Sequence, residues 1–191
     1  MKTWATKLFL LATAVLLALT TRSASAQFAP YAMFSLGHYS GVGVGYGTAN
    51  NQSGGMTALG GTFGIYDDRY RLGPLRFGPD ARLLIENSSN SSPYGNKLLG
   101  GLVGARLDAS GIPALPFNPY IQAEIGDVGT NNGSSYNRTG SFAYQIQFGG
   151  DFTLFPHVAL RAEYGAGQLS TANNTSHTLQ TFGAGLVVRL H

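Results

Sequence analysis

The 191-residue sequence contains no cysteine, which excludes disulfide bonds, thiolate metal ligands and thiol catalysis. Charged residues make up only 11% of the chain, about half of the share that is usual for a soluble domain. Lysine is scarcer still, because Lys97 is the one lysine after residue 26. Soluble proteins normally cover their surface with mixed charges, so this chain is short of the side chains that keep a protein in water.

The sequence also lacks an apolar run long enough for a transmembrane helix. The longest run, residues 8–19, has 12 residues, whereas a spanning helix needs about 20. This run follows a start with two lysines and precedes the small residues at positions 24–26, which is the pattern of a cleaved secretory signal. We therefore predict a signal peptide over residues 1–26 and a mature domain over residues 27–191.

The net charge of +3 comes entirely from three basic residues in the predicted signal, so the mature domain carries nine basic and nine acidic residues. A domain without excess positive charge lacks the electrostatic footprint of a nucleic-acid-binding protein. We therefore expect no nucleic-acid partner. We also expect no catalytic residues, no metal and no cofactor.

What the mature chain does contain is a repeated alternation of apolar and polar residues. The clearest case is residues 141–152, where every second residue is apolar or glycine. A period of two is typical of a strand with one apolar face. Eight such segments have roughly the 9–11 residues that cross a bilayer at a tilt. The sequence therefore predicts an all-β, eight-stranded antiparallel up-and-down transmembrane β-barrel.

The connections between these segments alternate in character. Four are rich in Asn, Ser and Thr, namely residues 50–55, 87–96, 127–140 and 170–176. The other three are residues 67–73, 108–119 and 154–157. In a barrel with a periplasmic N-terminus, the first set would be the outer loops and the second set the periplasmic turns. Pro79 lies inside the third strand and cannot donate a ladder hydrogen bond, so we expect a bulge there or a strand that starts at Asp80.

Ten of the 18 charges of the mature chain fall on the predicted strands, opposite the apolar face. They are Arg76, Asp80, Arg82, Glu86, Arg106, Glu124, Asp151, Arg161, Glu163 and Arg189. An arginine facing lipid near the midplane would cost about 2–4 kcal/mol, and five would consume roughly the 5–15 kcal/mol of a domain's net stability. We therefore predict that these charges fill the lumen as balanced pairs. Inward glycines such as Gly78 and Gly149 would make room for the arginines.

The mature chain resembles the OmpA/OmpX-like small outer-membrane barrels in its strand number, in its loop asymmetry and in its alternating last strand, residues 178–190. The resemblance implies a monomer in the lipid of the bacterial outer membrane, with a last strand that is read by the outer-membrane assembly machinery. That class usually ends in an aromatic residue, whereas this chain ends in Arg189-Leu190-His191. In several members inward charges act as a plug or gate, and the ten strand charges are similar to such a network.

The sequence thus favours a non-enzymatic barrel with a structural or surface-interaction role. Three alternatives stay open. The first is a narrow gated solute pore. The second is an outer-membrane lipid hydrolase, because His38 and Ser40 share one face of a strand and Glu124 or Glu163 could complete the site. The third is a soluble lipocalin-like barrel that binds a ligand, with the charges outside and the aromatic residues inside.

Overall fold

The computed structural model describes residues 28–40, 56–88, 96–109, 117–132, 139–170 and 176–190. The predicted signal peptide lies outside these residues, as do the central parts of the four predicted outer loops. The described residues form nine strands: β1 (Phe28–Tyr39), β2 (Met56–Asp67), β3 (Tyr70–Leu72), β4 (Leu75–Ser88), β5 (Asn96–Asp108), β6 (Phe117–Asn132), β7 (Thr139–Phe155), β8 (Val158–Ser170) and β9 (Ser176–Val188). Within these ranges no helix is long and apolar enough to span a bilayer.

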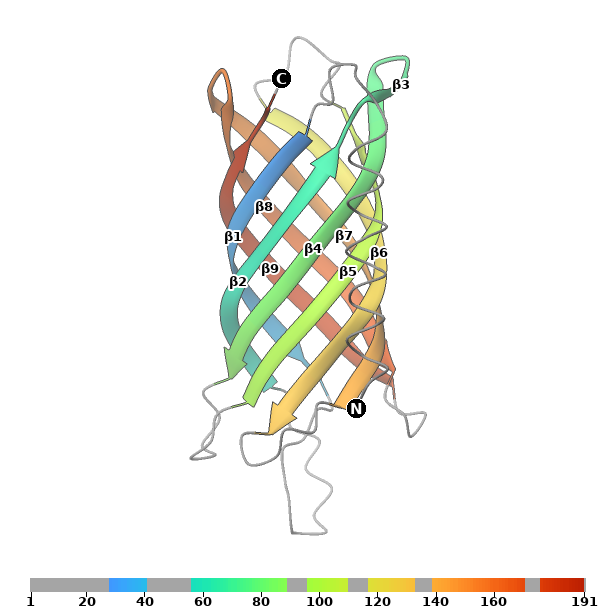
Figure 1. The fold of residues 1–191 in the computed structure, drawn as a ribbon, viewed down its shortest axis with the longest axis vertical. Coiled ribbons are helices and arrows are strands. Elements are labelled where there is room, and N and C mark those ends of the chain that lie inside the picture. The colour runs from blue at the N-terminus through green and yellow to red at the C-terminus, as the bar shows by residue number, and fades with distance from the viewer. Residues whose placement is uncertain are drawn as a thin grey trace, which may run out of the picture.

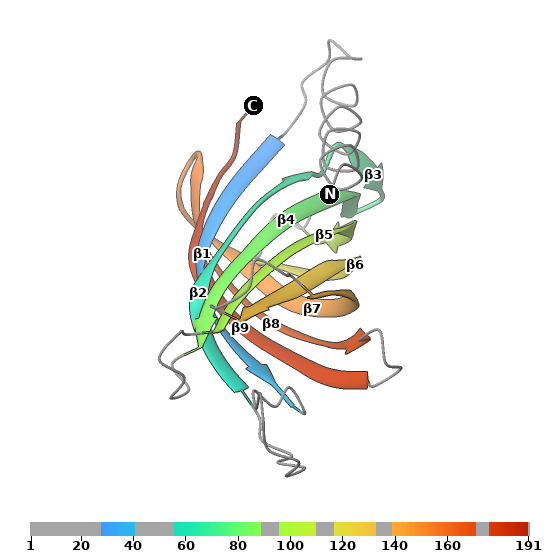
Figure 2. The ribbon, with the colours of Figure 1, turned by 60° about the horizontal axis from the view of Figure 1, so that its bottom comes forward.

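The eight long strands form a closed antiparallel barrel, as predicted (Figure 1). Successive long strands pair with one another, and β1 also pairs with β9, so that the sheet closes on itself. Figure 2 shows the strands following one another around the barrel axis. We call the end at which β1 begins and β9 finishes the terminus end, and the opposite end the loop end.

The short strand β3 departs from the prediction, which assigned residues 67–73 to a turn. β3 pairs with the start of β4, and the rings of Tyr70 and Phe77 stack with their centroids 5.3 Å apart. Gly73 takes a φ of 61°, a left-handed conformation that suits glycine and closes the hairpin. β3 extends the β-structure at the terminus end of the barrel (Figure 1).

Two outcomes were expected at Pro79. A strand that starts only at Asp80 is wrong, because β4 begins at Leu75 and runs through the proline. The expected bulge does lie beside Pro79. The register with β5 continues without a shift, with Pro79 opposite Ala105. The irregularity lies on the other side of β4. The pairing with β2 ends at Asp80 and the pairing with β3 resumes at Phe77, so that residues 67–69 face only two residues of β4. The proline thus sits where the ladder to β2 is already interrupted.

The third predicted outer loop, residues 127–140, is shorter than the sequence suggested. β6 continues to Asn132 and β7 starts at Thr139, and the two strands remain paired as far as Thr130 and Thr139. Asn and Gly are poor strand formers, so local propensity argued for a loop. Here the ladder to the neighbouring strand outweighs that local preference.

The two faces of the barrel wall are chemically opposite. Along β1 the residues alternate between buried and exposed from Ala29 to Tyr39. The aromatic residues that the lipocalin-like alternative placed inside are instead between 42% and 57% exposed on the outer wall, namely Phe142, Tyr144, Phe148, Phe152 and Phe182. The strand charges are on the other face, so this alternative is excluded.

The apolar band on the outer wall ends at one level near the loop end. Outward residues change there from apolar to polar, for example from Leu36 to His38 on β1. His38 lies opposite Thr57 of β2 and Gln180 of β9 in the strand register. Farther along the sheet, the exposed residues Asn87 of β4 and Lys97 of β5 are opposite one another. Such a polar row marks the boundary of the part that faces hydrocarbon.

Candidate functional site in the barrel lumen

Four inward tyrosines connect the barrel wall to the predicted charges, and each donates a hydrogen bond to a different buried acid. The bonds are Tyr31 to Asp80 at 2.9 Å, Tyr39 to Glu86 at 2.5 Å, Tyr66 to Asp151 at 3.2 Å, and Tyr120 to Glu163 at 2.6 Å. The sequence analysis did not include these tyrosines in the network. Their hydroxyl groups give each acid a donor besides any arginine that it binds.

Two of these tyrosines fit into the lumen because a glycine lies directly opposite on the next strand. Tyr31 pairs with Gly64, and Tyr120 pairs with Gly149. A Cβ atom added to either glycine would collide with the tyrosine ring. The prediction that inward glycines make room for arginines was therefore wrong at Gly149, where the nearest side chain is a tyrosine.

Gly149→Ala is expected to destabilise the barrel by about 1–3 kcal/mol, because the added methyl group would overpack the Tyr120 ring. Gly101→Ala is the matched control, since its Cβ would meet only Leu83 at 3.9 Å on the outer wall. Urea unfolding of the two variants in lipid vesicles measures both effects. Equal stability of the two variants would contradict the packing argument.

Arg161 of β8 is the centre of the network near the terminus end, and its side chain is 0% exposed. Its guanidinium carbon lies 4.3 Å from the ring centroid of Tyr31, and 4.9 Å from those of Tyr66 and Tyr120. Two of its nitrogens donate to the Asp151 carboxylate at 2.8 and 3.0 Å. Aromatic faces and one carboxylate thus replace the water that this buried cation has lost.

Asp151 is shared by three arginines. Besides Arg161, it accepts a hydrogen bond from Arg106 at 3.0 Å, and Arg189 lies 3.6 Å away. Arg106 also packs 3.6 Å above the Tyr120 ring. Three arginines thus gather around the Asp151 carboxylate near the terminus end, and Arg106 also lies 3.6 Å from the buried Asp108.

Arg82, in the middle of the lumen, has the opposite arrangement, because one cation lies among three acids. It lies 2.6 Å from Glu163, 3.0 Å from Glu124 and 3.9 Å from Asp80. Two amides add donors to Glu124, those of Gln122 at 2.6 Å and Gln147 at 2.7 Å. The predicted balance of five positive and five negative charges therefore does not resolve into one-to-one pairs.

The remaining predicted charges lie at the edges of the network. Arg76 and Arg189 are at the terminus end, where their side chains keep 20% and 19% exposure. Arg76 pairs at 3.3 Å with Asp68, which lies between β2 and β3. Burial raises the pKa of the Asp68 carboxyl, and Asp108 raises it further. Glu86 forms no ion pair with an arginine of the described residues and is considered below.

An apolar cluster fills the lumen at the loop end, and we call it the loop-end seal. Its members are Tyr39, Ala58, Leu98, Leu102, Val128, Ala143, Leu169 and Leu179. Each is at most 4% exposed. The sequence analysis missed it, although Leu98 and Leu102 share the inward parity of Arg106 on β5 and so gave a readable signal.

The residues of the hydrolase alternative are not brought together. His38 and Ser40 point outward from β1, where His38 Nδ1 lies 3.3 Å from Thr57 Oγ1, and Ser40 Oγ accepts a hydrogen bond from the Thr178 N–H at 3.2 Å. Glu124 and Glu163 lie inside the barrel on Arg82. In the described ranges, no group of three or more His, Asp or Glu side chains is arranged to hold a metal ion.

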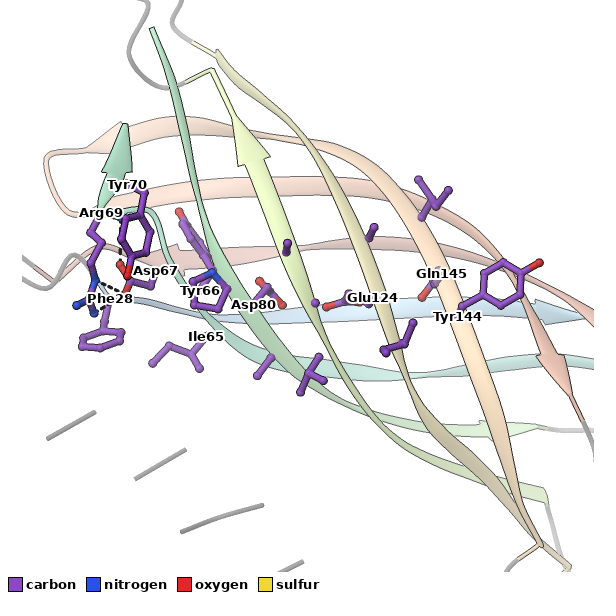
Figure 3. A pocket seen from close by; sticks show the side chains of 18 of the residues that line it. Phe28, Ile65, Tyr66, Asp67, Arg69, Tyr70, Asp80, Glu124, Tyr144 and Gln145 are labelled. Carbon is purple, nitrogen blue, oxygen red and sulfur yellow. Dashed lines mark hydrogen bonds and ion pairs between the residues drawn. The ribbon is translucent and has the colours of Figure 1, made fainter. Parts of the chain in front are cut away.

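A hollow on the outer wall is shown in Figure 3. Outward side chains of β2 and β4–β6 line much of it, namely Ile65, Ala81, Val103, Ala105, Ala123 and Ile125. At its terminus end Arg69 contacts Asp67 and lies 5.6 Å from the Phe28 ring centroid. The lining also includes Asp80 and Glu124, whose carboxylates lie near Arg82 in the lumen network.

A closed barrel with an apolar outer wall, polar residues near its loop end and a buried charge network in its lumen defines an integral membrane β-barrel. Residues 9–189 match the family model described as "Outer membrane protein beta-barrel domain". The chain belongs to this family, and the protein resides in the bacterial outer membrane. No curated protein matches the sequence.

Solved structures share the fold at low sequence identity. Neisserial surface protein A is 18% identical with a TM-score of 0.63, over 85% of this chain and 97% of that one. Ail, the attachment invasion locus protein of Yersinia pestis, is 10% identical with a TM-score of 0.54, over 87% and 100%. OprG from Pseudomonas aeruginosa is 12% identical with a TM-score of 0.52, over 87% and 96%. At such identities the similarity concerns the fold.

Proposed function

We propose that the protein is a non-enzymatic outer-membrane barrel that acts through its wall and its outer loops rather than through its lumen. The filled lumen is the observation that carries this proposal. The loop-end seal occupies the lumen at one end, and Arg161 with its three tyrosines occupies it nearer the other. An eight-stranded barrel is only wide enough for its own side chains, so these two layers leave no open path for a solute.

The similar structures agree with a role at the cell surface. One is named a surface protein and another an attachment invasion locus protein. The predicted outer loops of the present chain are polar and nearly uncharged, which suits contact with neutral polar surfaces such as glycans. The separation of His38 and Ser40 from the lumen glutamates supports a role without catalysis.

The wild-type barrel is expected to show no single-channel conductance in planar bilayers, because both lumen layers would have to rearrange before an ion could pass. An open porin inserted under the same conditions is the control for insertion and detection. Regular unitary steps from the purified wild-type protein would overturn the closed-lumen proposal and favour the narrow pore instead.

Cells provide the test of the role itself. A strain without the protein is complemented with the full chain, or with a chain in which residues 41–55, 89–95, 133–138 and 171–175 are replaced by short Gly-Ser linkers. Adhesion to glycan-coated surfaces and entry of a hydrophobic dye are measured. Adhesion that needs the loops supports surface contact, and dye exclusion restored without them supports a structural role. If the strain without the protein matches wild type in both assays, the proposal fails.

A further inference from the structure

Glu86 has a buried carboxyl group that is not paired with any arginine of the lumen network. Its side chain is 0% exposed. It lies on β4 opposite Gly60 of β2 and Leu98 of β5. Because Gly60 and Gly37 have no side chains, the carboxyl group can reach across β2 toward β1, and a Cβ on Gly37 would lie against Glu86 Oε2.

The absence of a cation distinguishes Glu86 from the other deep acids. Asp80, Glu124 and Glu163 surround Arg82, and Asp151 binds Arg161. No arginine or lysine of the described residues pairs with Glu86. A buried carboxylate without a cation is strongly disfavoured, whereas a neutral carboxyl group can be buried once it is hydrogen-bonded.

Glu86 accepts few hydrogen bonds for a buried carboxylate. Tyr39 donates to Oε2 at 2.5 Å, and the Ser35 hydroxyl lies beside the same carboxyl group. Oε1 has no hydrogen-bond partner, and neither has Ser35 Oγ. A stable buried carboxylate accepts several donors, as Asp151 does from its arginines. Glu86 has one well-placed donor.

Tyr39 connects this carboxyl group to the closure of the barrel, because it is itself a member of the loop-end seal. It is also the titratable group that contacts Glu86 from β1. The residues of β2 and β5 that lie opposite Glu86 are Gly60 and Leu98, and neither of them carries a charge. The nearest acid on β8 is Glu163. Its side chain packs against Gly183, the residue that pairs with Ser35, and its carboxylate binds Arg82.

We propose that Glu86 keeps its proton in the closed barrel and that the neutral carboxyl group, bound to Tyr39, is a latch that holds the loop-end seal. Loss of the proton places an unpaired negative charge beneath the seal. That charge draws water into the lumen and displaces Tyr39 from the seal. The latch rests on the closed lumen proposed above, and adds a condition under which the loop end of the lumen opens.

Infrared spectroscopy of the full barrel in phospholipid vesicles tests the proton directly. Glu86→Gln is expected to remove the carbonyl band of a protonated carboxyl group from the wild-type spectrum at neutral pH. Glu163→Gln is the matched control, because it removes a glutamate that is paired with Arg82 and should instead remove a carboxylate band. If the difference spectrum of Glu86→Gln shows the loss of a carboxylate band, the proposal is overturned.

Access of solvent to the loop-end seal as a function of pH tests the latch. A single cysteine introduced by Leu98→Cys, within the seal, is expected to be protected from a charged thiol reagent at neutral pH and to react as the pH is raised. In the Glu86→Gln background, which cannot ionise, the cysteine should stay protected. Equal reaction in both backgrounds at every pH would overturn the role of Glu86. Conductance of the wild type at neutral pH would instead refute the closed lumen, which separates the two failures. Gel mobility before and after boiling shows whether each variant is folded.

Discussion

Replacing Arg161 by alanine is expected to destabilise the barrel by about 3–5 kcal/mol, the usual cost of removing one partner of a buried ion pair. Arg161 is completely buried, so its loss leaves a space between three tyrosine rings. It also removes two of the hydrogen bonds to the Asp151 carboxylate. The remaining carboxylate would then depend on Arg106 and on the more distant Arg189.

Urea unfolding in lipid vesicles, followed by circular dichroism and by gel mobility before and after boiling, measures this loss. Arg71→Ala is the control, because Arg71 is exposed on β3 and a surface substitution changes stability by about 0.5 kcal/mol or less. A loss below about 1 kcal/mol for Arg161→Ala would show that the three tyrosines and Asp151 do not depend on this cation.

Arg82→Met is expected to have an effect of similar size for the opposite reason, since it removes the one cation among three acids. Asp80, Glu124 and Glu163 would then repel one another in a buried site, at a cost of about 3–5 kcal/mol. Glu163→Gln in the same chain removes the acid that lies nearest to Arg82 and should recover part of the loss. A double-mutant cycle of Arg82→Met and Glu163→Gln gives their coupling energy.

The pH dependence of Arg82→Met provides a further check. Because protonation removes the mutual repulsion of the three carboxylates, its loss of stability relative to wild type should shrink as the pH falls. Additive effects in the cycle, together with a loss that does not vary with pH, would mean that Arg82 acts only by filling space. The aliphatic methionine keeps much of that volume, so the comparison isolates the charge.

The sequence was sufficient to predict the barrel wall, because lipid on one side and a polar lumen on the other impose a strict alternation on each strand. Phe142 to Phe152 on β7 shows this most clearly. The alternation could not predict β3, where the stacking of Tyr70 on Phe77 adds a hairpin to a segment that is charged and turn-like. Pro79 itself indicated a bulge at this place, but not that the extra residue would lie in the neighbouring segment, residues 67–69, rather than in β4.

The candidate site was less accessible to sequence reasoning than the wall. The alternation along each strand identified the ten charges. Which charges pair, however, depends on the register between strands. The sequence therefore could not show that three arginines lie around Asp151 and none beside Glu86. The tyrosines were missed because tyrosine counts as apolar in a two-class pattern. A hydroxyl group at an inward position, as in Tyr31 and Tyr39, was the signal available.

The pairing of β1 with β9 determines when the barrel can close during folding. Tyr31 pairs with Val187, and Tyr39 pairs with Leu179, so the first strand gains its second neighbour only from the last. Closing so long a loop costs entropy before any of its contacts stabilise the product, so barrel formation is a late and cooperative event. A chain that ended before β9 would not give a smaller barrel. It would present two unpaired strand edges to other chains and tend to aggregate.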